Sequence, residues 1–277
     1  MGLIKKTKTA NKILHEEGME GIITILKRKL DTGFHPDESM MVFDLFKDET
    51  IKGVMLDIGA HHGSSLQPFA EAGWQVFAFE PDSENRVRLI ENTRHLPNVK
   101  VDPRAISDKA QQGVPFFRSE ESSGVSSLTA FLPTHANVGK VDVITLSDFF
   151  EEAELTGREL DFLKIDTEGY DLMVLKGLPW ERVTPRMILC EFEDFKTLPL
   201  GYSFHIMAGF LVEKGYKLLV SEWQPIERYG ELHHWKCFSR YPCKLEHARA
   251  WGNIFAVKEE DLYQRLMDKC GLVKKGS

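Results

Sequence analysis

The chain has 277 residues and a mass of 31.7 kDa, with 42% hydrophobic and 28% charged residues, which is typical of a globular protein. Its formal net charge of −7 argues against nucleic acid as the main partner, because no domain-wide basic face is expected. No apolar run is long enough for a membrane helix, and the first residues lack the apolar core of a signal peptide. The four cysteines form no C-x-x-C pair. We therefore expect no membrane insertion and a cytoplasmic location.

Residues 1–50 predict a helical N-terminal preface to a larger domain. Pro36 and Asp37 are helix-start residues, and the apolar residues after them, from Met40 to Phe46, recur at helical spacing. Such a preface is expected to pack on the domain that follows, which we place at residues 51–277.

The first motif of that domain lies at residues 53–63. An apolar run that includes Asp57 leads to Gly59 and Gly63, and Ser64 and Ser65 stand where a helix N-cap belongs. The pattern D-x-G-x-x-x-G differs from the dinucleotide pattern G-x-G-x-x-G, and an acid here suits a ligand with an ammonium group, such as the methionine end of S-adenosylmethionine. A second strand, residues 74–81, ends in Glu80, about 20 residues after the glycines, where a carboxylate holds ribose hydroxyls.

From residue 54 onward, strand and helix patterns alternate. This repetition predicts an α/β fold with a doubly wound, mostly parallel Rossmann-like sheet and helices on both faces. The polar stretch 120–128 is predicted to be an exposed loop. The later strands are expected near residues 99–102, 113–118, 141–145, 162–166, 187–192, 216–220 and 253–257.

Six motifs follow one another in an order that resembles the FkbM-type methyltransferases. They are LDIGAHHGSS (56–65), FAFEPD (77–82), AISD (105–108), SSGVSSL (122–128), VITLSDFF (143–150) and LKIDTEGYDLMVLKG (163–177). The resemblance covers roughly residues 54–192 and implies a class I methyltransferase that uses S-adenosylmethionine. The chain departs from the family at His61 and His62, where Asn and an apolar residue are common, so these histidines become candidates for cofactor or acceptor contacts.

The resemblance also implies a cofactor site. The loop after the first strand would hold the methionine end, Glu80 the ribose, and the residues after the second and third strands the adenine. The cofactor residues are thus expected to be Asp57, Gly59, Ala60, His61, Gly63, Glu80, Pro81, Asp82, Arg104, Ala105 and Asp166.

Methyl transfer to an alcohol requires alignment of the reactants and a base for the hydroxyl proton. Asp166, Glu168, Glu191 and His61 are the catalytic candidates, although Asp166 could instead only position the cofactor. The three acids could also bind a divalent metal, a route that we do not favour because nothing in the sequence defines the coordination. His234, Cys237, Cys243 and His247 have zinc-ligand chemistry, but their central spacing is longer than usual.

Residues 222–251 are predicted to be an inserted segment on the acceptor side, since they exceed an ordinary strand connection and are rich in aromatic residues. Aromatic rings beside polar groups suit a sugar, which has one apolar face and hydroxyls at its edge. The alternative is a hairpin buried at the sheet edge, or a dimer contact. The expected acceptor-binding residues are Tyr229, His233, His234 and Trp235.

The sequence therefore predicts an O-methyltransferase for a hydroxyl of a carbohydrate, a glycosylated compound or another secondary metabolite. Its partner would be a small-molecule or glycan acceptor, and its oligomeric state stays open. N-methylation of a small amine and a catalytically silent S-adenosylmethionine-binding module are the alternatives. Acids retained at Asp57, Glu80 and Asp166 argue against the silent module.

Overall fold

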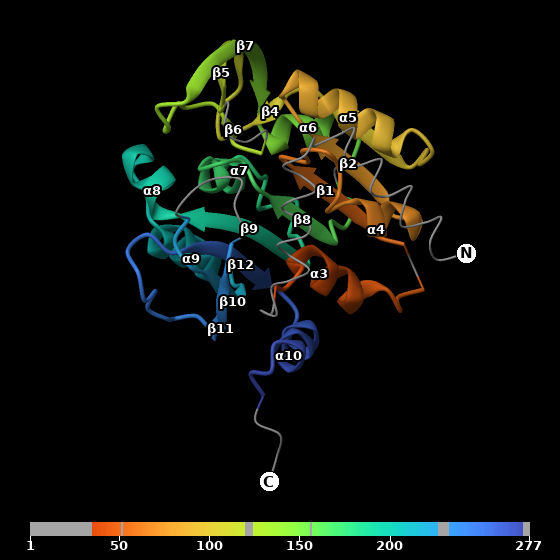
Figure 1. The fold of residues 1–277 in the computed structure, drawn as a ribbon. Coiled ribbons are helices and arrows are strands. Elements are labelled where there is room, and N and C mark those ends of the chain that lie inside the picture. The colour runs from red at the N-terminus through yellow and green to blue at the C-terminus, as the bar shows by residue number, and fades with distance from the viewer. Residues whose placement is uncertain (1–34, 51, 120–123, 156, 227–232, 274–277) are drawn as a thin grey trace, which may run out of the picture.

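A computed structural model describes residues 35–50, 52–119, 124–155, 157–226 and 233–273. The preface predicted for residues 1–50 is therefore described only from residue 35, and the predicted acceptor residue Tyr229 lies outside the described residues. The main structure is an eight-stranded sheet with helices on both faces (Figure 1). In spatial order its strands are β11 (Trp235–Arg240), β10 (Lys217–Trp223), β12 (Trp251–Val257), β9 (Met187–Glu193), β8 (Phe162–Ile165), β1 (Val54–Ile58), β2 (Gln75–Phe79) and β3 (Val99–Asp102).

The strands from β3 to β9 are parallel, and the edge beyond β9 is antiparallel. The chain runs outward from β1 to β3 and then returns to place β8 and β9 on the other side of β1. This reversal creates a topological switch point between β1 and β8, and ligands of doubly wound sheets bind beside the carboxyl ends of the strands there. The predicted fold class is confirmed.

Side chains alternate between the two faces of the sheet, so consecutive residues belong to different cores. In β1, Met55 packs on one face and Leu56 on the other. The Leu56 face is covered by α6 (Leu146–Glu152), α7 (Asp171–Lys176) and α9 (Phe204–Glu213). The Met55 face is covered by α3 (Glu38–Phe46), α4 (Gln67–Glu71), α5 (Ser83–Thr93) and α10 (Glu260–Lys269).

Helix α3 begins where the sequence predicts, because Asp37 caps it by accepting a hydrogen bond from the Met40 amide at 2.9 Å. Its apolar side lies in the Met55-face core, with Val42 and Phe46 fully buried. The described part of the preface is thus built into the domain. None of the helices in the described residues is both long and apolar enough to cross a bilayer.

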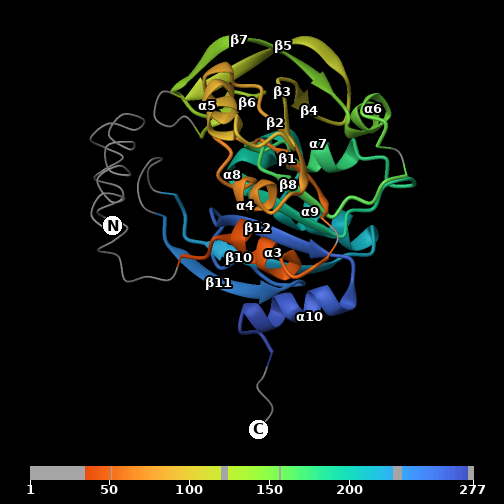
Figure 2. The ribbon, with the colours of Figure 1, turned by 90° about the vertical axis from the view of Figure 1, so that its right-hand side faces the viewer.

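A second, four-stranded sheet was not anticipated from the sequence, which placed these strands in one sheet. It lies at the end of the molecule beside α5 and α6, opposite α10 (Figure 2). Its order is β4 (Ala105–Ile106), β7 (His135–Ile144), β5 (Gln111–Ser119) and β6 (Ser126–Ser127).

Arg118 of β5 ties the small sheet to the start of α5. Its guanidinium pairs with both carboxylate oxygens of Asp82, at 2.6 and 2.7 Å, and Asp82 also caps α5. The expectation of an exposed loop at 120–128 is wrong for its described part, because Val125 and Ser127 are buried. Ser127 donates to the Glu168 carbonyl at 3.2 Å and is thereby held against the loop after β8. The short helices α8 (Asp194–Thr197) and η1 (Leu198–Leu200) follow β9.

Candidate functional site

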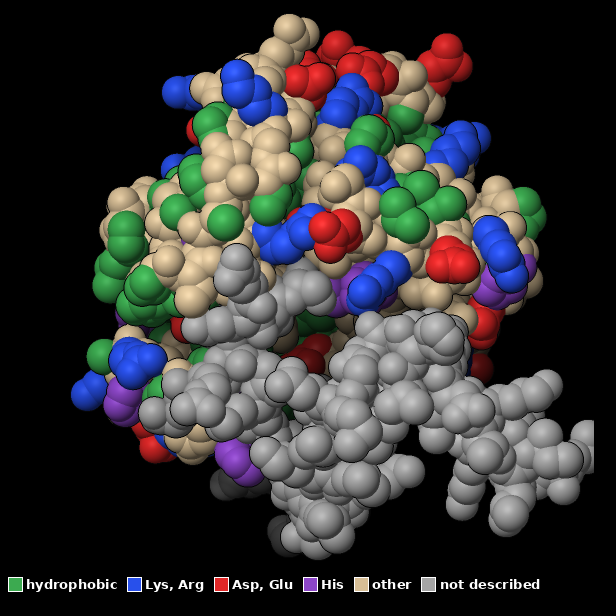
Figure 3. Space-filling view, turned by 45° about the horizontal axis from the view of Figure 1, so that its top comes forward, with side chains coloured by type: hydrophobic (Ala, Val, Ile, Leu, Met, Phe, Trp, Pro, Cys, Tyr) green, Lys and Arg blue, Asp and Glu red, His purple; other side chains and the backbone are tan. Residues whose placement is uncertain are grey.

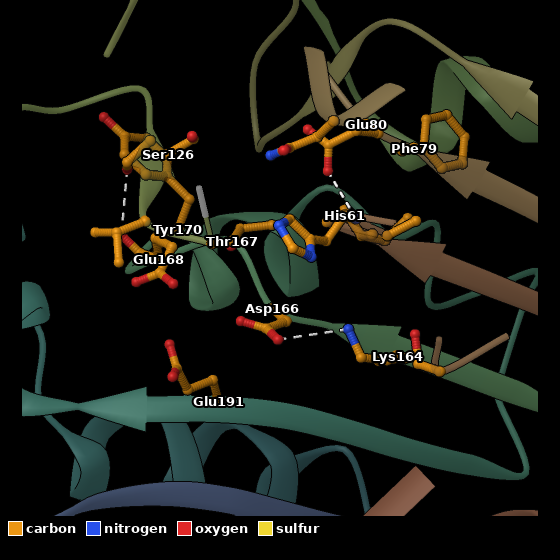
Figure 4. A pocket seen from close by; sticks show the side chains of 18 of the residues that line it. His61, Phe79, Glu80, Ser126, Lys164, Asp166, Thr167, Glu168, Tyr170 and Glu191 are labelled. Atoms are coloured by element: carbon orange, nitrogen blue, oxygen red, sulfur yellow. Dashed lines mark hydrogen bonds and ion pairs between the residues drawn. The ribbon is translucent and has the colours of Figure 1, made fainter. Parts of the chain in front are cut away.

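A cavity of about 470 Å³ opens at the carboxyl ends of β1, β2, β8 and β9, within the usual size of a small-molecule site. The loops after these strands, β6, the start of α3 and the edge strands surround it. Its polar lining is shown in part in Figure 4. The lining includes the predicted site residues Gly59, Ala60, His61, Glu80, Pro81, Arg104, Ala105, Asp166, Glu168, Glu191 and His233.

Gly59 brings the first loop against the loop after β8. Its φ of +81° favours glycine, and a Cβ built there would lie 1.9 Å from the carbonyl oxygen of Asp166. The amides of Gly59 and Ala60 both donate to the Phe79 carbonyl at 3.0 Å. This glycine therefore joins the ends of β1, β2 and β8 through backbone contacts.

Asp57 lies beneath the cavity rather than in its wall, with 0% of its surface exposed. One carboxylate oxygen is 3.2 Å from the Lys164 ammonium, and the other accepts a hydrogen bond from Ser65 at 2.6 Å. The same ammonium lies 3.5 Å from Asp166. Burial by itself lowers the pKa of Lys164, but the carboxylates of Asp57 and Asp166 outweigh it and raise that pKa. Lys164 is therefore a fixed positive charge beneath Asp166.

Glu80 is buried at the cavity wall, where its two carboxylate oxygens accept hydrogen bonds from the amides of His61 at 2.7 Å and Asp82 at 2.8 Å. Burial raises the pKa of Glu80 to about 7, against the lowering effect of these two amides. Each oxygen keeps a lone pair for a further donor. The carboxylate is thus in place to accept bonds from hydroxyls of a bound nucleoside.

His61 projects into the cavity between Glu80 and Asp166 (Figure 4). Its ring stacks on that of His62 with 3.6 Å between centroids. Burial, reinforced by the neighbouring His62, lowers the pKa of His61 to about 4. A neutral imidazole with so low a pKa is a weak proton acceptor at neutral pH, and its place suits contact with a ligand better than base catalysis.

The remaining predicted cofactor residues divide into two groups. Pro81, Arg104 and Ala105 line the cavity, and the Arg104 guanidinium is held by Asp102 at 2.8 Å and Glu152 at 2.8 Å. Asp82 and Gly63, like Asp57, do not line it. Asp82 is engaged by α5 and Arg118, and Gly63 adopts a φ of +87° in the turn that leads to α4.

Three acids converge on the other side of the cavity. Asp166, with 44% of its side chain exposed, points into the space between Glu168 and Glu191 (Figure 4). One oxygen of each of these three carboxylates lies within 4.8 Å of the others. Burial raises the pKa of Glu168 to about 7 and that of Glu191 well above its ordinary value, although the Lys196 ammonium lowers both. The structure thus places these three predicted catalytic residues side by side, and their catalytic role stays a prediction.

These three carboxylates could hold a divalent metal, since they offer hard oxygen ligands. Two of them already share one cation, because the Lys196 ammonium lies 2.5 Å from Glu168 and 3.1 Å from Glu191. Within the described part of the chain, His234, Cys237, Cys243 and His247 form no metal-binding group.

The end of the cavity near the edge strands is lined by residues from distant parts of the chain, among them Glu38, His233, Trp251 and Asn253. Trp251 stacks on Trp223 with 5.3 Å between ring centroids. Glu38 of α3 accepts hydrogen bonds from Trp223 at 2.8 Å and from Ser221 at 2.9 Å.

The predicted acceptor segment 222–251 is divided by the structure. Its middle part, β11, pairs with β10 at the sheet edge. The Trp235 ring packs on that of Phe238 with 4.9 Å between centroids, and its indole N–H donates a hydrogen bond to the Ser221 hydroxyl at 3.1 Å. Neither Trp235 nor His234 lines the cavity. His233 and Trp251, near the two ends of the segment, do line it. Of the predicted acceptor residues that the structure describes, only His233 faces the cavity.

Sequence reasoning missed Lys196, Glu38, Trp251 and Asn253 as lining residues. An N-cap pattern placed Glu38 on a helix but gave no sign of where that helix would pack. Lys196 follows β9 by three residues, and a lysine just beyond a strand that ends in two glutamates was the available signal.

Comparison with known proteins identifies the family of this chain. A family model, the methyltransferase FkbM domain, matches residues 57–218, which is more than half of the chain. The chain belongs to the FkbM methyltransferase family. It is thus an S-adenosylmethionine-dependent methyltransferase, as the motifs predict.

Several solved structures are distantly similar to the methyltransferase. An O-methyltransferase from Bacillus cereus in complex with SAH is 10% identical, covers 90% of this chain and 97% of its own, and has a TM-score of 0.44. A precorrin-6y C5,15-methyltransferase from Geobacter metallireducens is 14% identical over 82% of this chain and 92% of its own, with a TM-score of 0.42. A putative RNA methyltransferase from Pyrococcus horikoshii is 12% identical over 87% of this chain and 98% of its own, with a TM-score of 0.42. No curated protein sequence matches the methyltransferase.

Proposed function

We propose that this methyltransferase is an O-methyltransferase that acts on a hydroxyl of a carbohydrate or a glycosylated metabolite. The observation that carries the proposal is the position of Asp166, half exposed at the centre of the cavity and backed by the Lys164 ammonium at 3.5 Å. An alcohol is a poor nucleophile until its proton is removed, and a carboxylate that faces the cavity is a suitable acceptor.

In this reaction S-adenosylmethionine supplies the methyl group: the acceptor oxygen bonds to the methyl carbon while the carbon–sulfur bond breaks, its electron pair stays on sulfur, and S-adenosylhomocysteine remains. The chain aligns the two reactants and takes up the hydroxyl proton, which we assign to Asp166. Lys164 then stays charged and keeps the Asp166 carboxylate in place. Neutral His61 supports the donor without adding a positive charge beside the sulfonium.

The donor end of the cavity supports the cofactor assignment. A backbone loop with Gly59 offers close approach, and Glu80 has free lone pairs for ribose hydroxyls. Pro81, Arg104 and Ala105 are suited to border the adenine. Three further predicted residues would act from beneath the cavity. Asp57 would hold Lys164, Gly63 would form the turn into α4, and Asp82 would cap the start of α5.

The opposite end supports a sugar acceptor. Trp251 offers an aromatic surface, while Glu38, His233 and Asn253 offer hydrogen-bonding groups around it. A sugar ring needs this combination, because it is apolar on one face and hydroxylated at its edge. We place the acceptor here rather than against Trp235, which packs at the sheet edge.

We do not propose nucleic acid as the acceptor, because the cavity floor is acidic and the chain carries a net charge of −7. On the face seen in Figure 3, Lys and Arg side chains are interspersed with acidic and apolar ones. The four cysteines are free, in keeping with the cytoplasmic location that we propose.

The test is release of S-adenosylhomocysteine from S-adenosylmethionine in the presence of a panel of free sugars, glycosides and small amines. We expect turnover with glycosides and none with amines. Turnover with amines alone would favour the N-methyltransferase, for which the same acidic floor would attract the cationic acceptor. Tight cofactor binding without turnover of any acceptor would favour the silent module.

A further inference from the structure

Lys196 lines the cavity, and the proposed reaction leaves its charge unused. It lies on α8 with only 2% of its side chain exposed. Its ammonium is 2.5 Å from a Glu168 oxygen, 3.1 Å from a Glu191 oxygen and 2.8 Å from a Glu193 oxygen. Three acids from two segments thus share one buried cation.

Burying a lysine is costly unless its charge is paired, and packing carboxylates together is costly unless a cation lies among them. Divalent metal ions commonly provide that cation in sites made of carboxylates. Here an ammonium lies where two of the three grouped carboxylates, Glu168 and Glu191, would offer oxygens to a metal. The third, Asp166, is paired with Lys164 instead.

The backbone holds this arrangement from both sides. Glu168 has a φ of +55°, in the left-handed region, and its carbonyl accepts a hydrogen bond from Ser127. The Glu191 amide donates to Asp171 at 3.0 Å, and Asp171 also accepts from the Thr167 hydroxyl at 2.7 Å. The loop after β8 and strand β9 are thereby tied together beneath the two carboxylates, whose heads meet at Lys196.

We propose that Lys196 is a built-in cation: its ammonium takes the place of a divalent metal among the carboxylates of Glu168 and Glu191, fixes them beside Asp166, and makes methyl transfer independent of metal. Lys196 is thus a positioning residue, not a group that touches the reacting atoms. The expectation that methyl transfer needs no metal rests on the proposed function, whereas the expectation that the Lys196 ammonium replaces a metal ion does not.

The first experiment measures Mn²⁺ binding to the full chain, by calorimetry and by the electron paramagnetic resonance signal of free Mn²⁺. The variants are Lys196→Ala and, as a matched control, Lys109→Ala, which removes an exposed lysine. We expect Lys196→Ala to bind Mn²⁺ at least about tenfold more tightly than the wild type and Lys109→Ala. Equal binding by all three would overturn the proposal, as would tight wild-type binding that is lost in Glu191→Gln.

The second experiment measures kcat and KM with an accepted glycoside, with and without EDTA. We expect the wild-type kcat to be unchanged by EDTA, the kcat of Lys196→Ala to fall at least about tenfold, and Mn²⁺ to restore part of it. Lys196→Arg keeps the charge and should retain more activity than Lys196→Ala. A wild-type enzyme inactivated by EDTA and restored by Mn²⁺ would refute the proposal.

The two failures are distinguishable. If no acceptor is turned over, the proposed function is in question while the Mn²⁺ measurement still judges the cation. If Lys196→Ala does not fold, the Mn²⁺ affinity of the wild type and its Glu191→Gln variant decides.

Discussion

The proposed donor end of the cavity is held mainly by backbone groups, whereas the proposed acceptor end is held by side chains from distant segments. At the donor end, two backbone amides bind Glu80, and Gly59 touches the backbone of Asp166. At the acceptor end, Glu38 of α3 binds Ser221 and Trp223, and Trp223 stacks on Trp251. Substitutions of side chains are therefore expected to alter the proposed acceptor end without moving the proposed donor end.

The largest effect is expected where the two ends meet, at Asp166. Asp166→Asn keeps the shape and removes the charge, so kcat should fall by roughly 100- to 10,000-fold, the range for loss of a general base. Cofactor affinity, measured by calorimetry, should change little. Asp108→Asn, at an exposed position, is the control. An unchanged kcat with a raised KM for S-adenosylmethionine would make Asp166 a positioning residue.

The second effect tests the backbone construction of the donor end. Gly59→Ala places a Cβ against the Asp166 carbonyl, so the free energy of unfolding should fall by about 3 kcal/mol or more, and cofactor binding should be lost. Gly157→Ala is the matched control, because Gly157 has a similar φ of +84° but nothing within 4 Å of the added atom. It should cost only about 1–2 kcal/mol. Equal losses for the two variants, measured by denaturant unfolding, would show that close approach at Gly59 is unimportant.

The third effect compares two tryptophans of the acceptor-side segment. Trp251→Ala should raise the acceptor KM by roughly five- to thirtyfold, equivalent to about 1–2 kcal/mol, with cofactor affinity retained. Trp235→Ala removes a ring packed on Phe238 and should instead lower the melting temperature by roughly 4–8 °C, for a loss of about 2 kcal/mol. If Trp235→Ala raised KM in a protein of wild-type stability, the acceptor site would extend to the sheet edge.

The smallest effect is the pH dependence of cofactor binding. The pKa of Glu80 is raised to about 7, so its carboxyl is neutral below that pH and becomes a carboxylate above it. Hydrogen bonds from ribose hydroxyls to a carboxylate are stronger than those to a neutral carboxyl, so affinity should increase as the pH rises from 6 to 8. Glu80→Gln should remove this dependence and weaken binding at pH 8 by about 1–2 kcal/mol.

Calorimetry across this pH range provides the check, with Glu84→Gln, an exposed acid of α5, as the control. A dependence that persists in Glu80→Gln would assign it to another group.

Much of the donor end could be predicted from the sequence because it is local. The residues of β1, Gly59 and the acid that ends β2 lie within about 25 positions of one another, and strand period, glycine and N-cap rules act over such distances. The start of α3 at Asp37 followed from the N-cap rule. The convergence of Asp166, Glu168 and Glu191 followed from the order of the strands, because the carboxyl ends of neighbouring parallel strands meet at one edge of a sheet.

Tertiary structure alone decided the rest. The strands at 111–119 and 135–144 pair with each other in a separate sheet, and a strand pattern does not say which partner it will find. The same limit applies to the acceptor side, where the aromatic residues of one segment divided between the sheet edge and the cavity. Glu38 meets Trp223 only because α3 and β10, from distant parts of the chain, lie side by side. Lys196 is close in sequence to Glu191 and Glu193, but it meets Glu168 only because the loop after β8 lies beside β9. Such contacts depend on the packing of whole elements, and no local spacing in the sequence encodes them.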